Sequence, residues 1–295
     1  LEEMLGAEKL GFAMVCGRND QSPSLAEPLL EAGVPLIIEK PVARSAAEIA
    51  HLNEVAANKG VPIATGFTNR YMPVAVDFKK LVASGALGRI VSIEGRMITS
   101  TVQKRNPEHW LFKRSKSGGG ILSWLAIHTI DLIRYISGLE YRTVMGQVAT
   151  LSDTGIDVED MAALAFSMDN GAVGNLHAGY ILGQRYGDIY LSMRGTLGDA
   201  IWPMWDYDER GSMLKIQSEA PGWETVGYKE ITAVPKETPG YGGSVGQRYL
   251  TDFIDAAVQG QDFVTSGLDA QRAMEVVEAA YQSSETGTAF HMGGT

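Results

Sequence analysis

The chain has 295 residues, of which 45% are hydrophobic and 20% charged, a composition typical of a folded protein with a sizeable core. This composition excludes intrinsic disorder for the chain as a whole. A formal charge of −10 without any basic block argues against nucleic-acid binding. The single cysteine excludes an intrachain disulfide and a cysteine zinc cluster. No apolar run suits a membrane span and the start lacks the order of a signal peptide, so we expect a cytoplasmic protein.

Strand and helix patterns alternate from the first residues. Three short apolar runs are typical of buried parallel strands, at 10–16, 34–38 and 61–65. One helical pattern covers 23–31, and a second begins at Ser45, which forms a predicted capping box with Glu48 and ends before Gly60. This βαβαβ order predicts a doubly wound parallel sheet, and therefore an α/β protein.

The glycine fingerprint of a nucleotide-binding domain is missing from the expected place. A complete dinucleotide-binding domain carries G-x-G-x-x-G after its opening strand. No such motif precedes Leu10, and the glycine triplet at 118–120 lies far downstream without that spacing. We therefore expect residues 1–67 to form only the second half of a Rossmann-type NAD(P)-binding domain, and the chain as given to be truncated or poor in cofactor.

From residue 68 onward the patterns predict an α+β domain with an open, mainly antiparallel sheet. Strand patterns cover 90–98 and then a series of short segments between 142 and about 231, with hairpin signals at Asn170-Gly171 and at 194–198. Apolar stripes at helical spacing predict four helices, at 74–83, 125–136, 249–258 and 268–286. We expect residues 68–295 to form a domain for substrate binding and oligomerisation.

An open sheet with helices on one face leaves its other face in need of cover. Leu176 and Tyr180 share one face of their predicted strand, as Ile189 and Leu191 share one face of the next. Either pair could supply an apolar surface. We therefore predict a homodimer or homotetramer that assembles through this face.

Two motifs carry a resemblance to a known family. Glu39-Lys40-Pro41 ends a predicted parallel strand, and the triplet at 118–120 is followed by His128 and Asp131. With the tail that begins at Ser266, SGLDAQRAMEVVEAAY, the chain resembles the Gfo/Idh/MocA family, which includes glucose–fructose oxidoreductase and inositol dehydrogenase. The resemblance covers nearly the whole chain. It implies an N-terminal domain that binds NAD or NADP, and a C-terminal open sheet whose free face commonly makes the oligomer contact.

The chemistry of three residues supports the catalytic roles that this resemblance implies. Lys40, at the carboxyl end of a parallel strand, can donate to a substrate hydroxyl and stabilise alkoxide-like charge. His128 can take the hydroxyl proton, with Asp131 on the same helical face in support. Structural alternatives stay open: a surface lysine, a core histidine, and an aspartate paired with an arginine. We reject a metal site because the five histidines are widely scattered.

Trp124 departs from the family pattern, which usually has an aspartate four residues before the histidine. Tryptophan cannot transfer a proton, although it can pack against a sugar face or donate one N–H. His128 then works with Lys40 alone, or the chemistry has changed, or the protein is not a dehydrogenase. We interpret Trp124 as a substrate-binding residue, with plain core packing as the alternative.

Further residues are assigned to the site by resemblance or by position. The predicted cofactor-binding residues are Asn19, Glu39, Lys40, Pro41 and Asn69. Trp110, in the loop before the glycines, and Arg185 and Tyr186, at a turn of the sheet, could face the substrate, with ordinary surface positions as the alternative. Cys16 lies in an apolar run and is expected to be an inert buried thiol.

The sequence therefore predicts an NAD(P)-dependent oxidoreductase that acts on a secondary hydroxyl of a sugar, polyol or related compound. One rival is an NAD-dependent lyase or glycosidase that uses transient oxidation. A second rival is a non-catalytic or regulatory ligand-binding member of the same fold. The missing glycine fingerprint and Trp124 both favour the non-catalytic rival.

Overall fold

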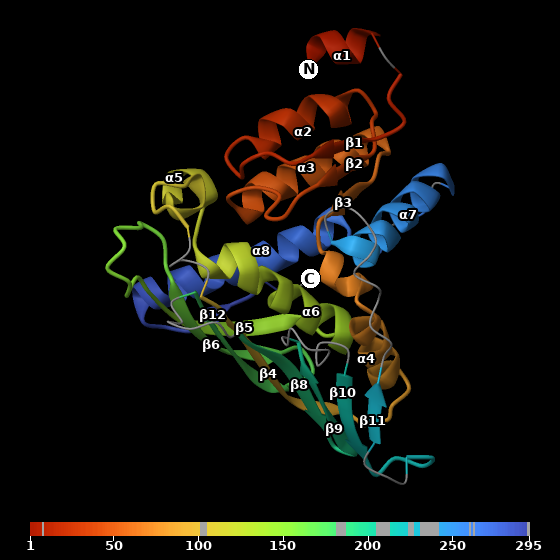
Figure 1. Cartoon of the computed structure of the whole chain (residues 1–295), viewed down its shortest axis with the longest axis vertical. Coiled ribbons are helices and arrows are strands. Elements are labelled where there is room, and N and C mark those ends of the chain that lie inside the picture. Colours follow the sequence, from red (N-terminus) through yellow and green to blue (C-terminus); the bar gives the residue numbers. More distant parts are fainter. Residues whose placement is uncertain are drawn as a thin grey trace.

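The computed structural model describes residues 1–7, 9–100, 105–180, 187–204, 213–223, 227–230, 242–259, 261 and 263–293. A small parallel sheet with order β1-β2-β3 lies at one end, and a nine-stranded sheet lies at the other (Figure 1). The first part of the chain contains α1 (Glu2–Ala7), β1 (Ala13–Val15), α2 (Ser22–Glu31), β2 (Leu36–Ile38), α3 (Ala46–Lys59) and β3 (Ile63–Thr65).

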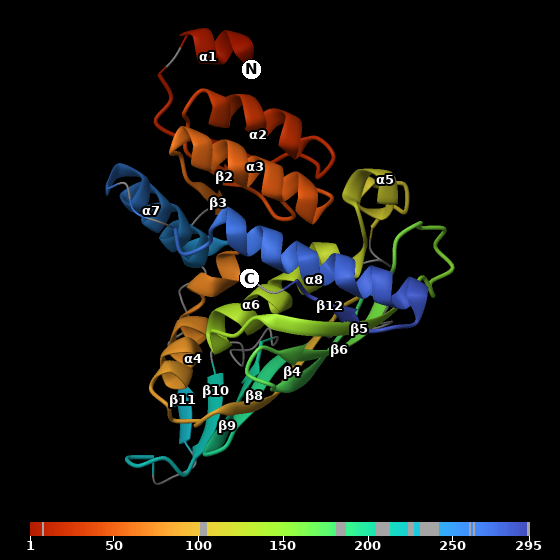
Figure 2. The ribbon, with the colours of Figure 1, turned by 180° about the vertical axis from the view of Figure 1, so that it is seen from behind.

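Alternation along β2 explains how the small sheet is covered on both faces. Leu36 and Ile38 belong to the main core with residues of α2 and α3, whereas Ile37 belongs to a second cluster with Tyr249 and Phe253. Those two aromatic residues lie on α7 (Gly243–Gln259), near the end of the chain. The tail of the chain therefore returns to cover the first sheet, and α7 lies beside β3 in both views (Figures 1 and 2).

The sequence signals for α3 are confirmed. The Ser45 hydroxyl accepts from the Glu48 backbone N–H at 3.2 Å, the Glu48 carboxylate accepts from the Ser45 N–H, and Gly60 caps the other end with φ of 66°. All three parallel strands are shorter than predicted, with three residues each. The βαβαβ order is as predicted.

The second sheet has the order β11-β10-β9-β8-β4-β7-β6-β5-β12. Its neighbours are antiparallel except β4 and β7, which pair in parallel. The Asn170-Gly171 hairpin joins β6 to β7, and the predicted turn at 194–198 joins β8 to β9. The strands are β4 (Ile90–Ile98), β5 (Tyr141–Ala149), β6 (Met161–Met168), β7 (Val173–Gly179), β8 (Asp188–Gly195), β9 (Gly198–Pro203), β10 (Met213–Ser218), β11 (Gly227–Glu230) and β12 (Phe290–His291).

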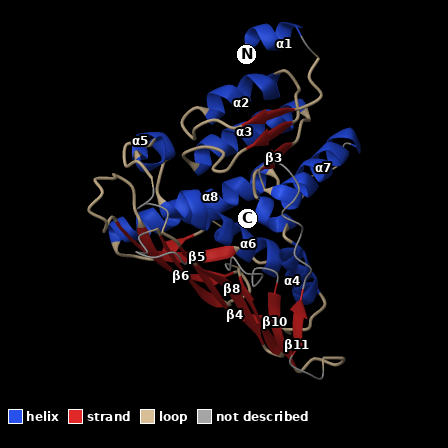
Figure 3. Ribbon diagram, in the orientation of Figure 1, coloured by secondary structure: helices blue, strands red, loops and turns tan. Residues whose placement is uncertain are grey.

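Helices cover one face of this sheet (Figure 3). The main ones are α6 (Ile127–Ser137) and α8 (Gly267–Thr286), and α4 (Pro73–Ala83) packs against α6. The described residues also include short segments: the 3-10 turns Thr68–Tyr71 and Trp110–Phe112, α5 (Arg114–Ser117) and the π-helix Leu122–Ala126.

The two apolar pairs, either of which was expected to supply the apolar surface of the free face, both lie on the covered face. Leu176 contacts the same space above Gly95 as Thr129 and Ile133 of α6, and Leu191 pairs with Gly95 in register. The exposed fractions of Leu176, Tyr180, Ile189 and Leu191 are all 6% or less. The expectation that one of these pairs lies on the free face was wrong. Strand alternation determines which residues share a face, but not which face the helices cover. Exposed residues of the opposite face include Met145 and Val173.

Three further predictions need correction. The helix expected at 125–136 is preceded by a π-helix that starts at Leu122, and the helix expected at 249–258 begins at Gly243. Cys16 is exposed, not buried. Because β1 is the edge of the described three-stranded sheet and α7 packs on β2 and β3, neighbouring residues such as Phe12 and Met14 are also exposed.

No helix within the described ranges is long and apolar enough to cross a membrane. Over those same ranges, no group of three or more His, Cys, Asp or Glu side chains is arranged to hold a metal ion.

Candidate active site

Lys40 lies just past the carboxyl end of β2, at a cis peptide bond to Pro41. Its ammonium donates a hydrogen bond of 2.6 Å to the backbone carbonyl of Trp124. Burial lowers the pKa of Lys40 to about 8, although the neighbouring Glu39 carboxylate opposes this shift. Lys40 therefore keeps its proton at neutral pH and can lose it at a mildly alkaline pH.

Glu39 is folded back beneath the same turn. Its carboxylate accepts from the Lys40 backbone N–H at 3.0 Å, and burial raises its pKa. A Cβ at Gly66 would lie only 2.9 Å from a Glu39 carboxylate oxygen, so any other residue there would push Glu39 away. This contact explains why the segment after β3 starts with glycine.

His128 is the second residue of α6 and lies four residues, about one turn, after Trp124. Its ring meets the Phe67 ring edge-on at 6.0 Å between centroids, and its Nδ1 is buried without a hydrogen-bond partner. Burial, and in second place the Lys40 cation, lower the pKa of His128 well below its usual value. The imidazole is therefore neutral at pH 7 and free to accept a proton.

The helix that carries Trp124 and His128 is anchored at its start by Glu159. The Glu159 carboxylate accepts from the backbone N–H groups of Gly120 at 2.8 Å and Leu122 at 3.1 Å, and from the Tyr281 hydroxyl at 2.8 Å. A carboxylate is stabilised at a helix N-terminus, although burial raises the pKa of Glu159. No motif in the sequence pointed to Glu159. It lies in a short acidic segment before β6, with Asp157 and Asp160 as neighbours, and only the structure separates it from them.

The glycine triplet before this helix is required by close packing. A Cβ at Gly120 would overlap the Glu159 backbone carbonyl, and one at Gly119 would overlap the Tyr281 hydroxyl. Gly118 has φ of 81° and packs against Arg44. These glycines let the start of the helix approach α8 and the residues before β6 closely. This packing positions the helix that carries Trp124 and His128 beside Lys40.

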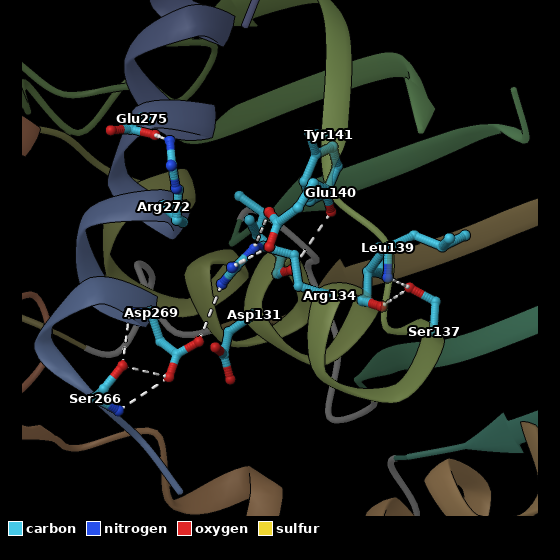
Figure 4. Close-up of polar contacts among 12 residues, drawn as sticks. Asp131, Arg134, Ser137, Leu139, Glu140, Tyr141, Ser266, Asp269, Arg272 and Glu275 are labelled. Carbon is cyan, nitrogen blue, oxygen red and sulfur yellow. Dashed lines mark hydrogen bonds and ion pairs between the residues drawn. The ribbon is translucent and has the colours of Figure 1, made fainter. Parts of the chain in front are cut away.

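Asp131 is held by an arginine. Its two oxygens accept from Arg70 at 2.9 Å and 2.5 Å, and the exposed fractions of the two side chains are 1% and 5%. Arg70 also pairs with Asp269, which caps α8 through Ser266. Figure 4 shows Asp269 between Ser266 and Arg134, with Asp131 beside them. The contact with an arginine is the structural alternative that the sequence left open for Asp131.

The remaining predicted residues have different surroundings. Asn19 is buried, and its amide donates to the Ser117 carbonyl at 2.6 Å, which ties the turn after β1 to the glycine triplet. Asn69 is half-buried in the turn Thr68–Tyr71. Trp110 is half-buried, with its ring 5.7 Å from the His109 ring. Arg185 and Tyr186 lie outside the described residues.

The Trp124 side chain is half-buried between two other side chains. The Arg105 guanidinium lies over its ring at 4.7 Å from the centroid, and the Tyr180 ring meets it edge-on at 5.7 Å. Trp124 thus contributes its backbone to Lys40 and its ring to Arg105. The π-helix around Trp124 belongs to a class of helix irregularity that is frequent at functional sites.

Comparison with protein families gives two matches that together cover most of the chain. The model described as "Oxidoreductase family, NAD-binding Rossmann fold" matches residues 1–67. The model described as "Oxidoreductase family, C-terminal alpha/beta domain" matches residues 79–292.

Individual relatives are similar over part or most of their length. Levoglucosan dehydrogenase of Pseudarthrobacter phenanthrenivorans is 26% identical over 300 residues, which cover 90% of this chain and 76% of that protein. Myo-inositol dehydrogenase Hyg17 of Streptomyces leeuwenhoekii is 30% identical over 172 residues, which cover 57% of this chain and 50% of that protein.

Solved structures share the fold. An oxidoreductase domain protein from Kribbella flavida has a TM-score of 0.88 at 23% identity, covering 99% of this chain and 83% of that one. Levoglucosan dehydrogenase in complex with NADH and levoglucosan has a TM-score of 0.86 at 24% identity, covering 98% and 82%.

Proposed function

Since this chain belongs to the Gfo/Idh/MocA oxidoreductase family, we propose that it oxidises a secondary hydroxyl of a sugar, polyol or related compound to a ketone, with NAD or NADP as hydride acceptor. The relatives named above act on levoglucosan and myo-inositol, both of which carry secondary hydroxyls. The reaction is reversible.

The observation that carries this proposal is the contact between Lys40 and the Trp124 carbonyl. It joins the carboxyl end of β2 to the helix of His128 at 2.6 Å, across 84 residues of sequence. A proton donor is thereby held at a residue one helical turn before a neutral proton acceptor, at the edge of a parallel sheet where α/β proteins bind their ligands.

The residues present suit the nicotinamide end of a dinucleotide. The carboxyl ends of the three parallel strands meet at one edge, where Asn19 and Lys40 follow β1 and β2. The Nδ1 of His128 is buried and has no hydrogen-bond partner among the described residues. Asn19, Glu39, Lys40, Pro41 and Asn69 are our proposed cofactor contacts. When bound, NAD(P)⁺ supplies the acceptor for the hydride that leaves the carbinol carbon.

Lys40 and His128 have different roles at the substrate hydroxyl group. The Lys40 ammonium donates to the hydroxyl oxygen, orients it and stabilises the negative charge that develops there. His128 takes the hydroxyl proton while the C–H bond breaks and the C=O bond forms, so that one proton and one hydride leave the alcohol. In the reverse direction, His128 returns the proton to the alkoxide.

Asp131 is proposed to act through the position of α6. Its buried pair with Arg70 fixes the helix one turn beyond His128 against the turn that follows β3. The ring of His128 packs on Phe67 in the same segment. We assign Asp131 as a positioning residue that supports His128.

The non-catalytic alternative is favoured by one observation. Trp124 has no group that can exchange a proton with Lys40 or His128, and its carbonyl can only accept a hydrogen bond. A binding protein of this fold would keep the ligand-binding residues and show no turnover.

We also propose a cytoplasmic location and a homodimer or homotetramer. The oligomer is supported by the exposed Met145 and Val173 on the uncovered sheet face.

Turnover with a panel of sugars and polyols tests the proposal. The purified chain is mixed with NAD⁺ or NADP⁺ and each compound, and the reduced cofactor is followed by its absorbance. We expect reduction with at least one compound and its loss in the Lys40→Met, His128→Ala double variant. Saturable binding without turnover for any compound would favour the non-catalytic alternative. Turnover that survives in the double variant would contradict the assigned residues.

A further inference from the structure

Arg105 is a cation without an acidic partner in the described part of the chain. Its exposed guanidinium lies over the Trp124 ring, and no carboxylate among the described residues pairs with it. Nearby cations of the loop before the glycine triplet do have carboxylate neighbours: Lys113 is 3.0 Å from Glu108, and Arg114 is 3.8 Å from Glu159. Arg105 therefore keeps its full hydrogen-bonding capacity toward a ligand.

Two carboxylates that precede β6 are hydrogen-bonded to backbone groups. Glu159 accepts from Gly120 and Leu122 at the start of the helix. Asp160 accepts from the backbone N–H groups of Leu151 and Ser152, both at 2.8 Å. Neither carboxylate forms an ion pair with Arg105.

Trp124 connects Arg105 to the reaction centre. Its carbonyl holds the Lys40 ammonium at 2.6 Å and its ring lies under the Arg105 guanidinium at 4.7 Å. Both cations therefore contact the same residue, Lys40 through its backbone and Arg105 through its ring. A carboxylate at position 124, as the family resemblance implies for other members, would add a negative charge at this point. The chain is acidic overall, with a net charge of −10, yet it has an uncharged ring at position 124.

We propose that the substrate of this enzyme carries an anionic substituent, a carboxylate or a phosphate, which binds the Arg105 guanidinium while Lys40 and His128 act on a hydroxyl group. The inference rests on the proposed function and names the substrate class for the same site. A guanidinium offers paired N–H donors that match both anions in geometry and charge. The Trp124 ring orients Arg105 for this contact by a cation–π interaction.

Matched neutral and anionic compounds separate this inference from the general one. D-Glucose is compared with D-glucuronate and D-glucose 6-phosphate, and D-galactose with D-galacturonate, in turnover with NAD⁺ or NADP⁺ and in thermal-shift titration. The variants are Arg105→Gln, Arg105→Lys, and Arg89→Gln as the matched control. Arg89 is an exposed arginine at the opposite end of β4 from the site.

We expect the wild-type chain to favour an anionic compound over its neutral partner. Arg105→Gln should raise KM for that compound roughly tenfold, the usual loss for a hydrogen bond to a charged group. Arg105→Lys should recover part of this loss, Arg89→Gln should change nothing, and added salt should raise the wild-type KM. The preferred anion decides between carboxylate and phosphate.

Two results would overturn the inference. Equal or better turnover of the neutral partners leaves the proposed dehydrogenase intact but removes the anionic substrate. Absence of any thermal shift by all three anions, or a shift unchanged in Arg105→Gln, removes it as well, whether or not turnover is found. Anion binding that depends on Arg105 without turnover would support the anion site and count against the dehydrogenase.

Discussion

The Lys40 ammonium is bound by the backbone carbonyl of Trp124 at 2.6 Å, at the residue where the family resemblance implies an aspartate side chain. A carbonyl offers a partial negative charge and no exchangeable proton, so it can hold the lysine in place but cannot share its proton. The contact keeps Lys40 in position. Because Trp124 has no proton to exchange, proton transfer at the site is left to Lys40 and His128. This makes the roles of these two residues separable by substitution.

Lys40→Met should reduce kcat much more than it raises KM. The ammonium matters most when negative charge develops on the hydroxyl oxygen, whereas methionine fills a similar volume without charge. Steady-state kinetics of the full chain on an oxidised polyol provide the measurement. Lys80→Met, an exposed lysine on α4, is the control and should behave as wild type. Unchanged kcat in Lys40→Met would remove the lysine from the mechanism.

His128→Ala should lower kcat by roughly 10²- to 10⁴-fold, the usual contribution of a positioned acid–base group. The pH profile carries a second expectation. Since the pKa of His128 is well below its usual value, kcat/KM should stay constant as pH falls from 7 to about 6.5 and decline only below that. Since the pKa of Lys40 is about 8, activity should fall again as the ammonium is lost above that pH. An acid limb above pH 7 would contradict the neutral histidine.

Trp124→Asp tests what the indole ring does. The new carboxylate would stand on the residue whose carbonyl holds Lys40, so this cation should offset part of the cost of burying it and the fold should survive. The melting temperature should fall by a few degrees at most, and any preference for anionic substrates should disappear because Arg105 becomes neutralised. Trp124→Phe retains an aromatic ring and should keep that preference. Unfolding of Trp124→Asp at room temperature would show that the ring is needed as core.

Asp131→Ala should destabilise the fold by about 3–5 kcal/mol, because it leaves the buried Arg70 without its main partner. Asp153→Asn, an exposed carboxylate before β6, is the control and should leave stability unchanged. Denaturant unfolding gives the free energy, and kcat of the folded fraction gives the activity. A large loss of kcat at unchanged stability would indicate a direct catalytic role for Asp131 in place of a positioning role.

The uncovered face of the large sheet should mediate self-association. Met145 and Val173 are 48% and 61% exposed on that face, and charged substitutions there should oppose burial against a second copy. Light scattering is expected to give two or four times 31.8 kDa for the wild-type chain, and a lower mass for Val173→Glu. A mass near 31.8 kDa at all concentrations would contradict the oligomer.

Local features of the chain were predictable because they depend on residues a few positions apart. The capping box of Ser45 and Glu48, Gly60 at the end of α3, and the Asn170-Gly171 hairpin all appear where the sequence indicated. Each depends on one hydrogen bond or one backbone angle within a single turn. The position of Lys40 after a parallel strand followed from the same kind of signal.

Only the tertiary structure decided which groups meet. The pair of Arg70 with Asp131 spans 61 residues, and Glu159 reaches Gly120 across 39. Which face of β7 and β8 lies under the helices depends on how α6 packs, so the alternation of Leu176 and Leu191 could not reveal it. The exposure of Cys16 follows from the position of β1 at the edge of the described sheet. Such contacts depend on how whole helices and strands pack, and no short segment of the sequence specifies that packing.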